Sequence, residues 1–131
     1  MLNKITQDVA FGLSEEERMH LILQLFFKEN LTKTSTYSSM DWVGESGVQY
    51  ELKARKVKKN QYDTTIIPAS KLDNLDKGVF IFKFLDGVWY IEYDKELFKT
   101  FFVADVYCDA RYGNPNRPHI HIPVSLLKPL N

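Results

Sequence analysis

The sequence predicts an α+β fold in which a mixed β-sheet is flanked by helices. Three observations indicate this fold class: an N-capped apolar helix beginning near Ser14, a pair of strand-like segments on either side of residues 44–47, and a second pair around Asp86-Gly87. A further helix is expected between the two pairs, and more strands after them. Helices and strands in this order typically form an α+β domain.

The first helix is expected from Ser14 to about residue 29. Ser14 suits the N-cap, and Glu17 three residues later completes a capping-box pattern. The apolar residues within 19–27 cover a wide stripe, so the helix should be largely buried. At about 100° per residue, Glu15 points toward this apolar side. An inward carboxylate at a helix end is either a cap or part of a site.

A hairpin should follow the helix. Residues 30–39, rich in Thr and Ser, are expected to form a loop that enters a strand at Tyr37–Val43. A turn at residues 44–47 then leads into a second strand at Val48–Val57. In this hairpin Asp41 would lie opposite the early part of the second strand, within reach of Glu51.

Alternation along the second strand separates an ionic face from an apolar face. Side chains of successive strand residues point to opposite sides. The ionic face therefore carries Gln49, Glu51, Lys53 and Arg55, and the other carries Tyr50, Leu52 and Ala54.

The rest of the chain alternates between strand and turn signals. Asp86-Gly87 between two apolar, aromatic segments is the strongest hairpin signal in the sequence. The expected elements, in order, are an extended segment at Thr64–Ile67, a helix from Pro68 to Asp76 ended by Gly78, strands at Val79–Leu85 and Val88–Tyr93, a helical turn at Asp94–Lys99, a strand at Phe101–Cys108, a loop at Asp109–Pro118 and a strand at His119–Val124.

Length and composition indicate one domain spanning residues 1–131. Hydrophobic residues make up 44% of the chain and aromatic residues 14%, which argues against disorder. No apolar run approaches the ~20 residues needed to span a bilayer, and Asp8 interrupts the segment that a signal peptide would use. The single cysteine, Cys108, has no disulfide partner. We therefore expect a soluble, cytoplasmic protein with no membrane contact.

The net charge of zero provides no global field to attract a polyanion. Basic residues nevertheless cluster within residues 53–59. Such a cluster beside a carboxylate suits a site that handles phosphodiesters, because it offsets phosphate charge and leaves the acid free to hold a metal. A solvated strand end and turn is the alternative.

One motif resembles a known enzyme family. Asp41, nine intervening residues and then Glu51-Leu52-Lys53 resemble the PD-(D/E)xK nuclease superfamily, and the string Tyr50–Arg55 looks like phage, restriction and resolvase-type members. The resemblance covers roughly Ser14–Leu85, and Met40 stands where the name of the motif has proline. It implies a restriction-endonuclease-like core with extra C-terminal strands.

The resemblance also implies a chemistry, the metal-assisted hydrolysis of phosphodiester bonds in DNA. Asp41, Glu51 and the carbonyl of Leu52 would hold Mg²⁺ or Mn²⁺, which prefer oxygen ligands. Lys53 would orient the attacking water or stabilise developing charge. Glu15, or its neighbour Glu16, would match the acidic residue on the first helix of many members.

The expected partner is nucleic acid. Phosphate contacts would come from Arg55, Lys56, Lys58 and Lys71. The sequence does not distinguish DNA from RNA, duplex from branched or single-stranded substrate, or an endonuclease from an exonuclease. Because so small a domain has little surface for sequence readout, a homodimer with two sites or a targeting partner is a further expectation.

Three alternatives stay open. The chain could retain this α+β fold as a catalytically inactive nucleic-acid-binding or structural protein. It could also be an unrelated interaction module in which Glu51 and Lys53 form a surface ion pair. Finally, His119 and His121 share a strand face at a spacing that can chelate Zn²⁺, although an exposed strand face is the favoured explanation of this pattern.

Overall fold

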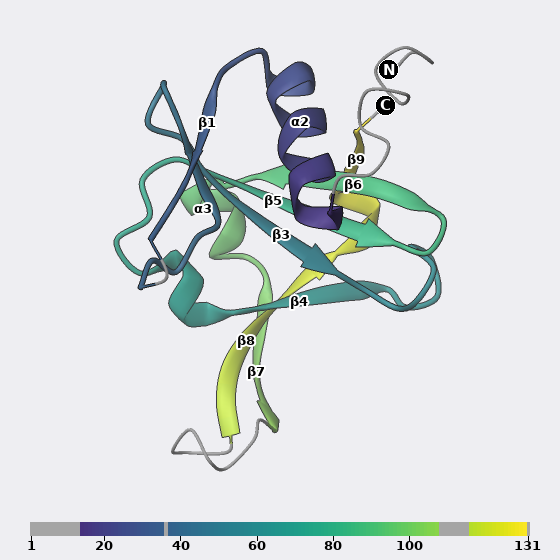
Figure 1. Cartoon of the computed structure of the whole chain (residues 1–131). Helices are drawn as coiled ribbons and strands as arrows, with labels where there is room; N and C mark the ends of the chain where they lie inside the picture. The colour runs from purple at the N-terminus through teal and green to yellow at the C-terminus, as the bar shows by residue number, and fades with distance from the viewer. Residues whose placement is uncertain (1–13, 36, 108–115, 131) are drawn as a thin grey trace.

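A computed structural model describes residues 14–35, 37–107 and 116–130 (Figure 1). The protein is α+β, as predicted, with a mixed sheet and two α-helices among the described residues. The helices are α2 (Glu15–Phe27) and α3 (Lys95–Phe98), with 3₁₀ turns η1 (Ala69–Leu72) and η3 (Val124–Leu126). The strands are β1 (Leu31–Lys33), β2 (Trp42–Gly44), β3 (Gln49–Ala54), β4 (Thr64–Pro68), β5 (Gly78–Phe84), β6 (Gly87–Glu92), β7 (Phe102–Tyr107), β8 (Asn116–Pro123) and β9 (Lys128–Pro129).

The larger sheet has the strand order β1-β2-β3-β5-β6-β9. Strands β3 and β5 are parallel, and the other neighbours are antiparallel. A parallel pair needs a long crossover. Here the crossover runs through β4 and η1, on the far side of the sheet from α2 (Figure 1).

Helix α2 covers one face of the large sheet. Its cap is the predicted one, since the Ser14 hydroxyl accepts a hydrogen bond from the Glu17 amide at 3.2 Å. The buried Met19 and Leu23 pack in one cluster with residues of β2, β3 and β5, including Trp42. This cluster fixes which side chains of β3 point toward the helix.

The smaller sheet, with the order β4-β8-β7, lies against the opposite face. The core there joins Phe80 and Phe82 of β5 to Ile67 of β4 and Ile122 of β8. Because β5 is buried on both faces, it is almost continuously apolar rather than alternating, as its sequence indicates. The middle of β3 lies beside it and is also covered from both sides.

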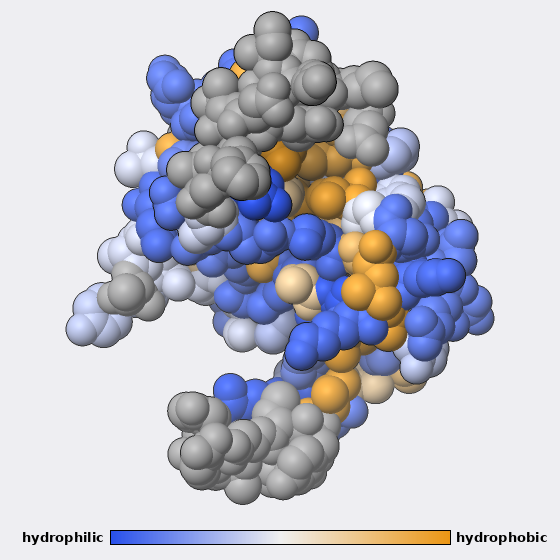
Figure 2. Space-filling view, turned by 45° about the vertical axis from the view of Figure 1, so that its right-hand side comes forward, coloured by the Kyte–Doolittle hydropathy of each residue, from blue (hydrophilic) through white to orange (hydrophobic). Residues whose placement is uncertain are grey.

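The β7–β8 arm projects from the body of the molecule (Figure 1). Its edge strand exposes two apolar side chains, Phe102 at 68% and Val103 at 52%. In the face shown in Figure 2, hydrophilic residues predominate and are crossed by a narrower apolar band. Among the described residues, β7 is therefore the edge strand of the smaller sheet, and apolar side chains lie beside this edge.

The segment that enters the first hairpin differs from the prediction. The loop expected at residues 30–39 contains strand β1, and the strand expected at Tyr37–Val43 is reduced to β2. Leu31 is buried under α2, which draws this segment into the sheet edge in spite of its polar composition. Thr34 holds together the two ends of the loop between β1 and β2, because its hydroxyl donates to the Asp41 carbonyl at 3.0 Å.

The prediction of a helix from Pro68 to Asp76 is wrong. Pro68 is the last residue of β4, and only the 3₁₀ turn η1 follows it. The Asp73 amide donates to the Ser70 carbonyl at 3.1 Å, and Asn74 adopts a left-handed φ of 60°. Ser, Asp and Asn favour such turns over helix interiors, which explains the early end.

The second hairpin and the α3 turn match the predictions. Gly87 has a positive φ of 150° at the turn between β5 and β6, and the Asp94 carboxylate caps α3. The C-terminal strand begins earlier than predicted, because β8 starts at Asn116, within the expected loop at residues 109–118. Residues 108–115, including Cys108, lie outside the described residues.

Candidate active site

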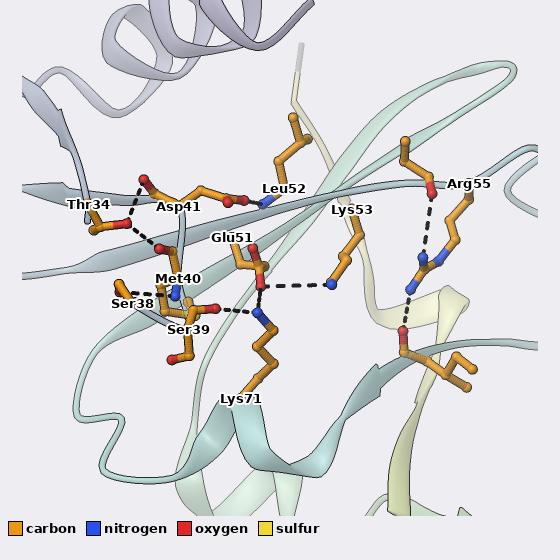
Figure 3. Close-up of polar contacts among 12 residues, drawn as sticks. Thr34, Ser38, Ser39, Met40, Asp41, Glu51, Leu52, Lys53, Arg55 and Lys71 are labelled. Atoms are coloured by element: carbon orange, nitrogen blue, oxygen red, sulfur yellow. Dashed lines mark hydrogen bonds and ion pairs between the residues drawn. The ribbon is translucent and has the colours of Figure 1, made fainter. Parts of the chain in front are cut away.

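The candidate site forms where β2 begins beside β3 (Figure 3). The register pairs Trp42 with Tyr50, and the Asp41 amide donates to the Tyr50 carbonyl at 2.9 Å. Asp41 lies immediately before β2, and its side chain makes the next hydrogen bond to β3: Oδ2 of Asp41 accepts from the Leu52 amide at 2.8 Å. The Asp41 carboxylate is thereby fixed at the edge of β3 beside Glu51.

Glu51 lies on the face of β3 opposite α2. Its neighbour in the register is Phe80, which packs in the core between the two sheets. Glu51 is only 3% exposed, so it does not form the surface ion pair of the interaction-module alternative. Two ammonium groups approach its Oε2: Nζ of Lys71 at 2.5 Å and Nζ of Lys53 at 3.9 Å.

The charges of this cluster are strongly perturbed. Burial, reinforced by hydrogen bonding to Asp41, raises the pKa of Glu51 to about 7, although Lys71 opposes the shift. Burial also lowers the pKa of Lys53, and the positive charges of Lys71 and Arg55 add to this. Near neutral pH, Glu51 therefore exchanges a proton readily, a property common among catalytic carboxylates.

Lys71 occupies a position that the sequence did not predict. It was expected to be a phosphate contact, but η1 brings it against Glu51, where it also donates to the Ser39 carbonyl (Figure 3). Its side chain is 20% exposed. No local pattern signals this contact, because it depends on how the β3–β5 crossover passes the sheet.

Glu15 is not brought together with Asp41 and Glu51. Its Oε1 lies 2.5 Å from Nζ of Lys83, which lowers the pKa of Glu15 through a hydrogen bond. Lys83 is on the same face of β5 as Ile81, against α2, whereas Glu51 is on the other face. Glu16 is also occupied on the helix side, by an ion pair with Lys33 at 3.2 Å.

The other predicted phosphate contacts lie just beyond the end of β3. Arg55 joins β3 to β4, since its Nε donates to the Thr65 hydroxyl at 3.3 Å and its Nη2 to the Ile66 carbonyl at 2.5 Å. Lys56 and Lys58 are exposed. Arg55 is therefore part of the scaffold, and the two lysines are available to a ligand.

A divalent cation suits the oxygen donors at the site. In an extended strand the amide and carbonyl of one residue point to the same side. The Leu52 carbonyl thus faces the same edge as the Asp41 carboxylate that accepts its amide. With Glu51 this makes an all-oxygen donor set of the kind that Mg²⁺ and Mn²⁺ prefer, and the Lys71 ammonium already places a positive charge there.

The histidine pair gives less support to a metal site. The Nδ1 atom of His119 lies 2.9 Å from the Arg117 carbonyl, and Nδ1 of His121 lies 3.5 Å from the Thr64 hydroxyl. Within the described parts of the chain, no group of three or more His, Cys, Asp or Glu side chains could hold a metal. A metal at Asp41 and Glu51 would therefore need the backbone carbonyl as a further ligand.

The sequence matches no protein-family model and no curated protein. Among the described residues, no helix has both the length and the apolar character needed to cross a membrane.

Proposed function

We propose that the chain is a metal-dependent nuclease that hydrolyses phosphodiester bonds in DNA. The observation that carries this proposal is the pairing of two carboxylates from adjacent strands. Asp41, bonded to the Leu52 amide, interacts with the buried Glu51, and Lys53 follows on the same strand face. The order of these residues agrees with the PD-(D/E)xK resemblance, and α2 precedes them as that resemblance requires.

Each residue has a defined task in the proposed reaction. Asp41, Glu51 and the Leu52 carbonyl would hold Mg²⁺ or Mn²⁺. The bound ion would stabilise charge on the scissile phosphate and lower the pKa of a water molecule. Lys53, whose ammonium is half-buried beside Glu51, would orient that water and neutralise developing negative charge.

Lys71 would act as a resident counter-ion in this scheme. It neutralises Glu51 in the state described here, and a cation held by Glu51 would compete for the same oxygen. After such competition the Lys71 ammonium could turn toward a phosphate, in keeping with the contact expected from the sequence.

A homodimer is part of the proposal. The β7 edge, with exposed Phe102 and Val103, provides a surface on which a second copy could continue the smaller sheet. Two copies would present two sites to the two strands of a duplex.

The decisive experiment is a cleavage assay on plasmid and on labelled oligonucleotides with Mg²⁺ or Mn²⁺. Wild-type protein should cut, and Glu51→Gln and Lys53→Ala should each lose at least about 100-fold in rate while remaining folded by circular dichroism. Glu96→Gln, an exposed substitution on α3, is the matched control. If the wild type cuts no form of DNA or RNA, the proposal fails.

A second candidate is a nucleic-acid-binding or structural protein that keeps this site without turnover. The low exposure of Glu51 and its close ion pair with Lys71 favour it, because such a pair can serve as a buried structural contact. This candidate predicts nucleic-acid binding or structural stability that depends on the cluster, with no cleavage under any metal condition.

A further inference from the structure

A cavity of about 310 Å³ lies beyond the candidate active site, between the end of β3, the segment 56–62 and β4. Its charged lining is entirely cationic among the described residues: Arg55, Lys56, Lys58 and Lys59. Four positive charges around one hollow attract an anion even though the protein as a whole is neutral.

Part of the cavity lining is apolar or aromatic. Val57, Ile66 and Phe84 contribute to its lining, and Tyr62 stands at its side with 61% of its surface exposed. A simple phosphate site would not need these groups. A ligand that carries both negative charge and a flat apolar face, such as a nucleotide, uses the whole lining.

The cavity is aligned with the carboxylates. Glu51, Lys53 and Arg55 follow one another on one face of β3, and Figure 3 shows them in a row. At about 3.3 Å per residue, Arg55 begins about 13 Å from Glu51. The guanidinium of Arg55 is held by β4, so it forms a fixed wall between the two sites.

We propose that this cavity binds one unpaired nucleotide of the nucleic acid whose backbone is at the carboxylate site. The base lies on the apolar part of the lining, against the Tyr62 ring, and Lys56 and Lys58 neutralise the adjoining phosphates. A base within a duplex can enter only after it is unpaired and unstacked, which costs free energy, so the cavity favours substrates with a single-stranded end or branch. This inference rests on the proposed function, since it assigns that enzyme a class of substrate.

Binding without metal tests the proposal separately from cleavage. Fluorescence anisotropy in EDTA would compare a blunt duplex with a duplex of the same paired length that carries a single-stranded overhang. We expect the overhang substrate to bind about tenfold more tightly. Tyr62→Ala should remove most of this preference and Tyr62→Phe should keep it, because stacking requires the ring and not the hydroxyl.

Two controls sharpen the result. Tyr37→Ala removes another exposed tyrosine, 98% exposed, and should leave the overhang preference unchanged. Lys58→Ala should weaken the binding of both substrates and reduce its salt dependence, because Lys58 contacts a phosphate in the proposed complex. Equal binding of blunt and overhang duplexes, or an unchanged preference in Tyr62→Ala, would overturn the proposal. Displacement of the overhang by polyglutamate as readily as by a single-stranded oligonucleotide would also overturn it, since it would indicate a general anion site.

The two proposals can fail independently. If the overhang preference depends on Tyr62 but the protein cuts no nucleic acid, the result supports nucleotide binding in the cavity and refutes the proposed nuclease activity. If cleavage depends on Glu51 but the overhang preference does not depend on Tyr62, the result supports the proposed nuclease activity and overturns the proposal that the cavity binds an unpaired nucleotide.

Discussion

The Lys71 ammonium lies 2.5 Å from Oε2 of Glu51, and this contact is the strongest attraction that the buried carboxylate experiences. It joins η1 to β3, and the Lys53 ammonium, at 3.9 Å from the same oxygen, is the more distant of the two cations. The stability and the metal affinity of the site should both depend on this pair.

Removal of the lysine should destabilise the protein in a pH-dependent way. In Lys71→Met, Glu51 keeps its burial and loses its closest cation, so its pKa should rise further. We expect a loss of about 3 kcal/mol in the free energy of unfolding at pH 8, and a smaller loss at pH 5, where Glu51 is protonated. Urea denaturation at the two pH values measures this. Adding Glu51→Gln to the Lys71→Met variant should abolish the pH dependence of the stability loss. If the pH dependence persists in the double variant, it does not arise from Glu51.

The wild-type protein should lose stability as pH rises through the titration of Glu51. The folded pKa is about 7, compared with 4.5 for an ordinary glutamate, so between these values the folded state holds a proton that the unfolded state has released. The contribution of Glu51 is fully present below pH 4.5 and is lost as pH rises to about 7, by about 3 kcal/mol at most. Glu51→Gln lacks this titration, so its stability relative to wild type should increase across the same window. Parallel pH profiles for the two proteins would exclude the raised pKa.

Divalent metal should stabilise the folded protein, most strongly above pH 7, where Glu51 is ionised. Saturating Mn²⁺ at about 100 times its dissociation constant should add about 2.7 kcal/mol, measured as a shift in the denaturation midpoint. Asp41→Asn and Glu51→Gln should abolish the shift, and Glu16→Gln should retain it. An equal shift in all four proteins would place the metal elsewhere.

Substitution of Glu15 should leave the proposed cleavage intact. Its ion pair with Lys83 lies on the α2 side of the sheet and is half exposed, so Glu15→Gln should cost less than about 1 kcal/mol in stability. Its cleavage rate should stay within a few-fold of wild type. A loss comparable to that of Glu51→Gln would mean that Glu15 reaches the site in the enzyme–substrate complex.

Dimer formation should depend on the β7 edge. Light scattering of the eluate from size-exclusion chromatography should show a concentration-dependent mass. Phe102→Ser should shift this equilibrium toward the monomer, because it removes an exposed apolar contact without touching the core. The exposed Leu25→Ser substitution on α2 is a matched control, and an equal effect of both would argue against a β7 interface.

The sequence predicted the local part of the site. The proximity of Asp41 to Glu51 was expected from a short turn between two paired strands, although Asp41 lies immediately before β2 and not within it. Strand parity predicted that the side chains of Glu51 and Lys53 point to the same face of β3. The first helix and its Ser14 cap were also predictable, since the capping pattern lies within the short segment from Ser14 to Glu17.

The parts that escaped prediction depend on contacts between distant segments. The helical phase of Glu15 predicted that it faces inward, whereas Glu15 is exposed at the start of α2. The phase also could not indicate on which face of the sheet the helix packs. The contact of Lys71 with Glu51 was missed because the crossover is a strand and a 3₁₀ turn rather than the predicted helix, so the direction of the Lys71 side chain was not predictable. Strand β1 was missed because its pairing with β2 and the burial of Leu31 outweigh the propensity of a polar segment.

The parallel pairing of β3 and β5 has a consequence for the order of folding. The β2–β3 hairpin is local and can form early, with Asp41 and Glu51 already adjacent. Lys71 reaches Glu51 only after the long loop through β4 has closed and β5 has docked beside β3. A nascent or partly folded chain therefore holds two neighbouring carboxylates with Lys53 but without Lys71, their closest counter-ion, and only the completed crossover brings all the charged groups of the site together.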